Sequence, residues 1–200
     1  KTYSRVEVDP ARLREHMRLK KEAAFHPQAL EDDRRAVLAF YWQEGFPDVR
    51  VETAASFSGD RRDVDVTLTV EEGQRQTVAE VAFQGLTAVA PARALEALHL
   101  RPGAVFQPFM VASDENTLGA LVAEEGYPHV RVTGTRLPGA RPGEVRLVYE
   151  VREGPRVTVG ALLFTGHLRT REEVLRRELE LTPGGPFRPG EVLQAERRLY

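Results

Sequence analysis

The chain has 200 residues and a mass of 22.4 kDa, which is the size of one or two domains. Hydrophobic residues make up 42% of it and charged residues 29%, a composition that argues against disordered and collagen-like proteins. The formal net charge of −2 offers no broad basic field, so we expect no nucleic-acid partner. Because the chain has no cysteine, disulfides, zinc–thiolate sites and thiol catalysis are excluded.

The ends of the chain suggest a piece of a longer protein. It opens on Lys1, without a signal-peptide pattern. No apolar run approaches the roughly 20 residues that span a bilayer. We therefore expect an excised segment that does not itself cross a membrane.

The sequence repeats itself with a constant offset. Glu44–Val51 returns as Glu125–Val132, an offset of 125 − 44 = 81 positions, and six of the eight positions are identical. Further segments return at the same offset without insertion or deletion: Val81–Gly85 as Leu162–Gly166 and Leu98–Gly103 as Leu179–Gly184. A unit of this length can fold as a small domain. The sequence therefore predicts a tandem array of domains rather than a solenoid.

The phase of the repeat sets the expected domain boundaries. We expect a first copy at 1–74 that lacks the start of its first strand, a complete copy at 75–155, and a partial copy at 156–200 without its C-terminal hairpin. The expected linkers between the copies are Gln74, Arg75, Gln76, Pro155 and Arg156.

In the first copy, Asp9 and Pro10 predict the start of a short helix, as N-cap and first helical residue. A second helix shows apolar residues with a period of 3.6: Leu30, Val37, Leu38 and Tyr41. The strands that follow are expected at Val49–Thr53 and Val64–Val70. The latter alternates between apolar and polar residues, as a strand with one buried face does.

The complete copy predicts five elements in chain order: a strand at Thr77–Phe83, a helix from Pro91 to Leu100, a helix from Pro108 to Glu125, and strands at His129–Thr135 and Val145–Val151. In the partial copy, Thr170–Glu173 forms a capping box at the start of a helix. The element order is β-α-α-β-β. We therefore expect the α+β class, with tandem domains that are each a small three-stranded mixed sheet covered by two helices.

No pattern of catalytic or metal-binding residues stands out. The five histidines form neither an H-x-x-x-H nor an H-E-x-x-H pair. The acidic pairs Asp32–Asp33, Glu124–Glu125 and Glu172–Glu173 fall on predicted helices, where a solvated face or a cap explains them. We expect no enzyme activity, no metal and no cofactor.

Tyr41 and Trp42 are neighbouring aromatic residues on the second helix. Tyr41 lies on the apolar face and is expected in the core. Trp42 points about 100° away around the helix, which makes it a candidate for an interface.

The motifs together resemble the polypeptide-transport-associated (POTRA) domain, and the resemblance covers essentially the whole chain. The matching segments are Phe83–Gly85, Glu125–Pro128, Val151–Pro155 and Leu179–Phe187. The first copy departs from the pattern, because Lys20, Lys21 and Glu22 replace the Pro-Gly turn.

The resemblance implies a function. POTRA domains form the periplasmic arm of outer-membrane assembly proteins of the BamA and TamA type. It therefore implies a location on the periplasmic side of the outer membrane and two kinds of partner: unfolded β-barrel outer-membrane proteins, and accessory lipoproteins or other periplasmic subunits. It also implies membrane attachment through a C-terminal barrel outside this chain. A two-partner secretion transporter, or a translocation or division complex in which the domains act as spacer or docking module, remains the alternative.

The edge of the expected sheet is the candidate binding site. An unpaired edge presents N–H and C=O groups to any extended chain, and strand addition there gives affinity with little sequence selectivity. We expect this edge in the strand after Glu-Gly-Tyr/Phe-Pro, as the resemblance also implies. Its residues are Val49, Arg50, Val51, Val130, Arg131, Val132 and Thr133. Replacing Thr133 with proline is expected to remove a donor from this edge.

The partial third copy leads to a separate expectation. Without its hairpin, the faces of Leu163, Phe164, Leu175 and Leu179 would be uncovered. We expect this part to be disordered or to be completed by another chain.

Overall fold

A computed structural model describes residues 10–15, 17, 25–60, 62–163, 165 and 182–199. The expected capping box at Thr170–Glu173 lies outside the described residues, as do Phe164, Leu175 and Leu179. Leu163 is described, and 89% of its surface is exposed.

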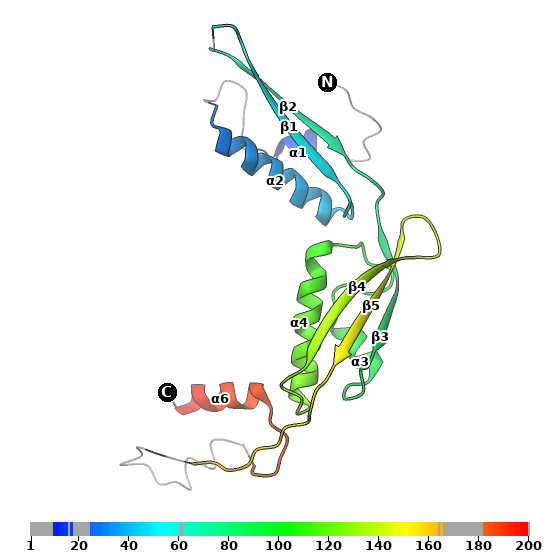
Figure 1. Ribbon diagram of the computed structural model, residues 1–200, viewed down its shortest axis with the longest axis vertical. Helices are drawn as coiled ribbons and strands as arrows, with labels where there is room; N and C mark the ends of the chain where they lie inside the picture. The colour runs from blue at the N-terminus through cyan, green and yellow to red at the C-terminus, as the bar shows by residue number, and fades with distance from the viewer. Residues whose placement is uncertain are drawn as a thin grey trace. The chain divides into compact units, whose positions relative to one another are not determined.

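In its described residues, the first copy contains two helices and a two-stranded antiparallel sheet (Figure 1). The helices are α1 (Pro10–Glu15) and α2 (Pro27–Gln43), and the strands are β1 (Arg50–Phe57) and β2 (Val64–Glu71). Pro27 suits the first turn of α2, where its missing N–H costs no hydrogen bond. The strands pair from Arg50 opposite Glu71 to Phe57 opposite Val64.

The core of the first copy lies between α2 and β1. Val37, Phe40 and Tyr41 from the helix pack with Phe46, Val49 and Val51. The rings of Tyr41 and Phe46 meet edge to face, 5.6 Å apart. Tyr41 is fully buried, which confirms its expected place in the core. Trp42 is partly buried against the same cluster.

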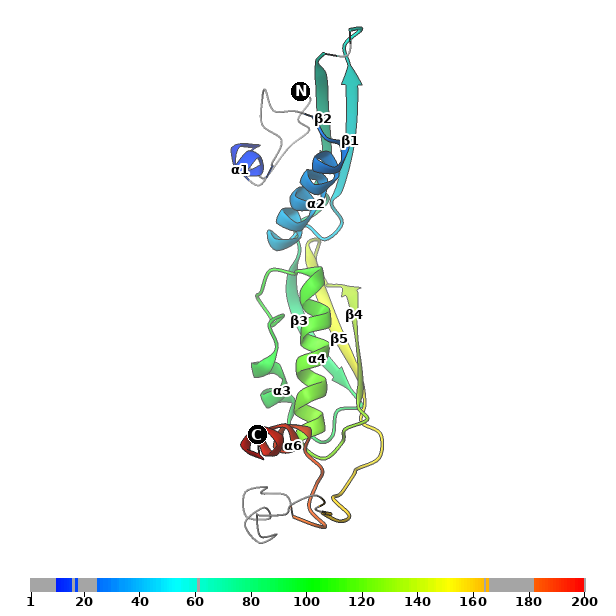
Figure 2. The ribbon, with the colours of Figure 1, turned by 90° about the vertical axis from the view of Figure 1, so that its left-hand side faces the viewer.

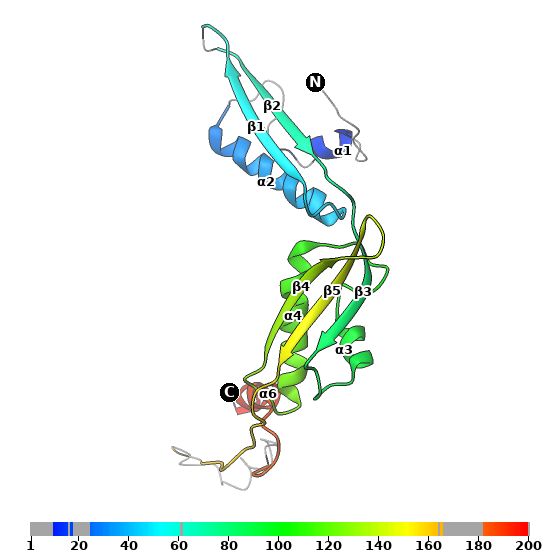
Figure 3. The same cartoon turned by 45° about the vertical axis from the view of Figure 1, so that its right-hand side comes forward.

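The second copy folds as the expected mixed three-stranded sheet with helices. Its elements are β3 (Thr77–Gln84), α3 (Pro91–Ala97), α4 (Pro108–Glu124), β4 (Arg131–Pro138) and β5 (Glu144–Arg152). The strand order is β3-β5-β4, and Figure 3 shows the arrows of β3 and β5 pointing the same way. The long helix α4 runs along one face of this sheet (Figures 1 and 2). Helix α3 ends at Ala97, before the expected end at Leu100, because the backbone is already extended at Leu98.

Apolar residues of both layers are buried in the second copy. Leu118 and Val122 of α4 are fully buried, as are Leu147 and Tyr149 of β5. Helix α6 (Pro189–Leu199) follows later in the chain. Within the described residues, none of the helices combines the length and the apolar character needed to cross a membrane.

Candidate functional site

The predicted binding residues lie in or next to two strands at sheet edges. In the order β3-β5-β4, strand β4 is outermost; it contains Arg131, Val132 and Thr133, and Val130 directly precedes it. In the two-stranded sheet, β1 begins with Arg50 and Val51, directly after Val49. The structure thus places all seven residues in an edge strand or directly before it.

Two hydrogen bonds show which backbone groups of β4 face outward. The Gly139 N–H donates to the Glu144 carbonyl oxygen at 2.8 Å, which makes 139 a position that bonds to the neighbouring strand. In an antiparallel ladder every second residue bonds to the neighbour and those between point away. The residues from 132 to 138 with even numbers therefore face outward. As this alternation requires, the Gly134 N–H donates to Glu115 Oε1 of α4 at 2.6 Å.

This register corrects the expectation for Thr133. Its N–H faces β5, so a proline at 133 would remove a bond inside the sheet rather than a donor at the edge. Sequence alternation could not reveal this, because it shows which face a side chain occupies and leaves the direction of the N–H open. The outward N–H next to it belongs to Val132.

Strand β1 repeats the same pattern. The Ser58 N–H donates to the Asp63 carbonyl oxygen at 3.0 Å, and these two residues are the repeat counterparts of Gly139 and Glu144. The outward positions of β1 are therefore Val51, Thr53, Ala55 and Phe57.

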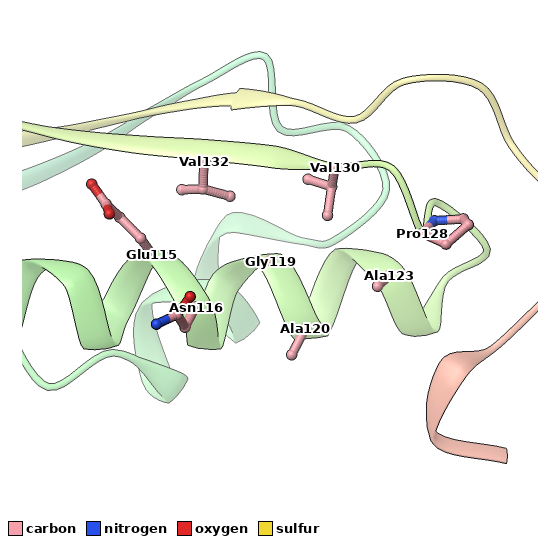
Figure 4. A pocket seen from close by; sticks show the side chains of 8 residues that line it. All are labelled: Glu115, Asn116, Gly119, Ala120, Ala123, Pro128, Val130 and Val132. Carbon is pink, nitrogen blue, oxygen red and sulfur yellow. The ribbon is translucent and has the colours of Figure 1, made fainter. Parts of the chain in front are cut away.

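A groove of about 340 Å³ runs between α4 and β4 (Figure 4). Val130 and Val132 point from the strand toward the helix, and Glu115 points from the helix toward the strand. The helix contributes small residues, which leave the space open. The full lining is Glu115, Asn116, Gly119, Ala120, Ala123, Pro128, Val130 and Val132. A groove beside an edge strand can take alternate side chains of an added strand.

The first copy has large side chains where the second has small ones. Leu38 and Trp42 are the repeat counterparts of Gly119 and Ala123, and both pack against the core of the first copy. Trp42 is partly buried against this core, and its role at an interface stays a prediction.

A buried carboxylate on α4 bonds the helix to two neighbouring segments of the second copy. Asp114 is fully buried and accepts the N–H groups of His99 at 2.8 Å and Leu100 at 2.9 Å. It also accepts the Tyr149 hydroxyl at 3.2 Å, and burial together with this carboxylate raises the pKa of Tyr149. These bonds hold the segment after α3 and strand β5 to α4.

Sequence reasoning missed Asp114, and it assigned the corresponding residue of the first copy wrongly. The sequence predicts a solvated face or a cap for Asp33, but its side chain is fully buried in the middle of α2. The overlooked signal was that Asp33 and Asp114 occupy the same position of the repeat.

Among the residues that the structure describes, no group of three or more His, Asp or Glu side chains could hold a metal ion.

Comparison with known proteins decides the family. The POTRA family model, described as a surface antigen variable number repeat, matches residues 4–73, 76–154 and 157–200. The chain belongs to the POTRA family. It is made of tandem POTRA repeats of the kind found in BamA-type proteins, as the sequence motifs predict.

The POTRA repeats are similar to several assembly factors. BamA of Neisseria meningitidis serogroup B is 26% identical over 177 residues, which are 88% of this chain and 22% of that protein. BamA of Neorickettsia risticii is 28% identical over 175 residues, 86% of this chain and 23% of that protein. The chain thus spans about a fifth of the length of these relatives.

Solved structures show the same fold. The crystal structure of Haemophilus influenzae BamA POTRA3-5 matches with a TM-score of 0.59 at 24% identity, and the match covers 96% of this chain and 80% of that one. A Haemophilus ducreyi BamA structure lacking POTRA domains 1-3 matches with a TM-score of 0.53 at 16% identity, over 72% of this chain and 26% of that one.

Proposed function

We propose that this chain is part of the periplasmic arm of an outer-membrane protein assembly factor, and that it holds unfolded β-barrel precursors by strand addition. The observation that carries the proposal is that β1 and β4 each lie at the edge of a sheet. The similarity to assembly factors supports the cellular role. Accessory lipoproteins or other periplasmic subunits are proposed as further partners.

The proposed mechanism uses main-chain hydrogen bonds. An extended precursor segment would accept from the outward N–H of Val132 or Thr53 and donate to carbonyl groups of the same edge. Such bonds do not depend on side chains, so one edge can hold many different precursors. Strands of outer-membrane barrels alternate apolar and polar residues, and their apolar side chains would lie toward the helix. No covalent bond changes in this process, so the proposed role is binding rather than catalysis.

Proline at outward positions tests the proposal. In the double variant Thr53→Pro/Val132→Pro, each edge loses one outward N–H, whereas Thr53→Ala/Val132→Ala keeps both. We expect the proline pair to bind a fluorescent synthetic peptide from an outer-membrane barrel strand at least about tenfold more weakly than the alanine pair, measured by anisotropy. Circular dichroism checks that both variants are folded. Equal affinity of the two pairs would refute strand addition.

One observation favours a second role as a spacer. The segments after β2 and β5, which contain the predicted linkers, are bonded to the turn at the end of the preceding helix. The Gln76 N–H donates to the Gly45 carbonyl oxygen at 2.7 Å, and the Val157 N–H donates to that of Gly126 at 2.8 Å. Such a spacer would also suit a two-partner secretion or division complex. If the chain binds an accessory subunit but no barrel peptide, the spacer role is the correct one.

A further inference from the structure

We infer that the two edges are not equivalent: the edge of β1 takes the added strand, whereas Glu115 and Pro138 close the edge of β4. The inference rests on the proposed function, because it names the edge that performs it. The occupant is an extended segment of an unfolded β-barrel precursor, lying alongside Val51–Phe57.

Two of the outward positions of β4 have no free N–H for an incoming strand. The Gly134 N–H is already bonded to the carboxylate of Glu115 at 2.6 Å, and a bond to a charged acceptor is stronger than one to a peptide carbonyl. Pro138, the last outward position, has no N–H. Proline and charged side chains are the usual means by which a sheet edge is protected from pairing. A strand added here would have to displace Glu115.

The corresponding positions of β1 lack both devices. Arg34 is the repeat counterpart of Glu115, and a guanidinium has no acceptor for an N–H. Arg34 is also held by two bonds to Glu31, at 2.7 and 2.6 Å. Phe57 stands where the second copy has Pro138, and it has an N–H. Every outward position of β1 therefore has a backbone donor.

The groove beside β4 does not reverse this difference. Glu115 stands at one end of its lining, and Val130 and Val132 line the strand side (Figure 4). Pairing that stops at Gly134 would involve only the first residues of β4. So few main-chain bonds do not offset the entropy lost when a flexible chain is ordered. The groove can accept a side chain, but the part of β4 that precedes Gly134 is too short for stable addition.

Exchanging the two helix residues tests the inference. The double variant Arg34→Glu/Glu115→Arg puts an acceptor next to Thr53 and removes the one next to Gly134. A photo-crosslinking residue, p-benzoylphenylalanine, replaces either Glu52 or Thr133, which are both exposed and occupy the same position of the repeat. The probe is the barrel-strand peptide, added to the whole 200-residue chain.

With the native residues at 34 and 115, we expect at least about tenfold more adduct at position 52 than at position 133, because one charge-assisted bond is worth about that factor. The exchange should lower the adduct at 52 and raise it at 133. The single variant Glu115→Ala should raise the adduct at 133 alone, which provides a second test if the double variant is unstable.

The outcomes separate the two proposals. Equal or greater adduct at 133 with the native residues, or no response to the exchange and to Glu115→Ala, would overturn the inference and leave strand addition standing. Absence of adduct at both positions, with a folded chain, would overturn the proposed function and this inference with it.

Discussion

Single acidic residues connect segments of this protein that lie far apart in the sequence. The carboxylate of Glu153 accepts the Thr87 N–H at 2.6 Å, the Thr87 hydroxyl at 2.5 Å and the Ala88 N–H at 2.6 Å. Its counterpart in the first copy, Glu72, accepts the buried hydroxyl of Tyr41 at 2.8 Å. The Glu-Gly pair that closes each of the first two copies therefore has a structural role beyond the turn.

The pKa of Glu153 reports on this role. Partial burial would raise it, but the bonds from the Thr87 hydroxyl and from the Ala88 and Thr87 amides outweigh burial, so the pKa lies below its ordinary value of 4.5. A carboxyl whose pKa is lower in the folded state stabilises the fold above its unfolded-state pKa. This stabilisation is lost as the pH falls through the folded-state pKa.

We expect Glu153→Gln to lower the free energy of unfolding by about 1 kcal/mol near neutral pH, because an amide accepts these bonds less well than a carboxylate does. The difference from the native chain should shrink as the pH falls from 4.5 through the lower folded-state pKa of Glu153, because the native carboxylate is then protonated as well. Urea unfolding at a series of pH values measures this. Glu150→Gln, whose partner is the exposed Arg152, is the control and should change little. A difference that does not depend on pH would contradict the assignment.

At the scale of elements, the sequence predicted most of the strands and helices but not the direction of their backbone bonds. Alternation in Val64–Val70 and the 3.6 period of α2 arise from burial of one face, and burial is encoded in residue types. Which N–H groups of β4 point outward depends instead on where the hairpin closes, at Gly139 and Glu144. That closure is a property of the pairing between strands.

Proline substitution in β4 makes this difference measurable. Thr133→Pro should destabilise the fold by about 2 kcal/mol, because it removes a bond to β5, leaves the partner carbonyl unpaired and places a ring in the ladder. Val132→Pro should cost less, because its N–H faces outward. Val132→Ala controls for the lost side-chain packing. Thermal unfolding of the three variants ranks them, and a more stable Thr133→Pro variant would show that the register is wrong.

At the scale of the whole molecule, the repeat reproduces the same connection twice. Gly45 and Gly126 both have a positive φ, of 94° and 96°, and each accepts a hydrogen bond from the segment that starts the next copy. A Cβ added at Gly45 would overlap Val105 Cγ1, whereas one at Gly126 would lie 3.1 Å from Pro186 Cβ. Glycine is required at both positions for its backbone conformation, and at Gly45 also for space.

We expect Gly45→Ala to destabilise the chain by about 2 kcal/mol, the sum of backbone strain and overlap with Val105. Gly126→Ala should cost less, because its neighbour leaves more room. Adding Val105→Ala should restore the stability that is lost through the overlap, but not the stability that is lost through backbone strain. Urea unfolding of the single and double variants measures both parts, and full recovery would show that the backbone conformation is not strained.

The sequence by itself determined the period of the repeat, the element order, the fold class and the family, because residue types along the chain show both the repeat and the alternation of buried and exposed positions. It also pointed to the strands that carry the candidate edge. Only the tertiary structure decided that Asp33 and Asp114 are buried and that Glu115 reaches the edge of β4. These features depend on which side chains of a helix meet the backbone of a distant strand, and spacing along the chain does not specify that contact.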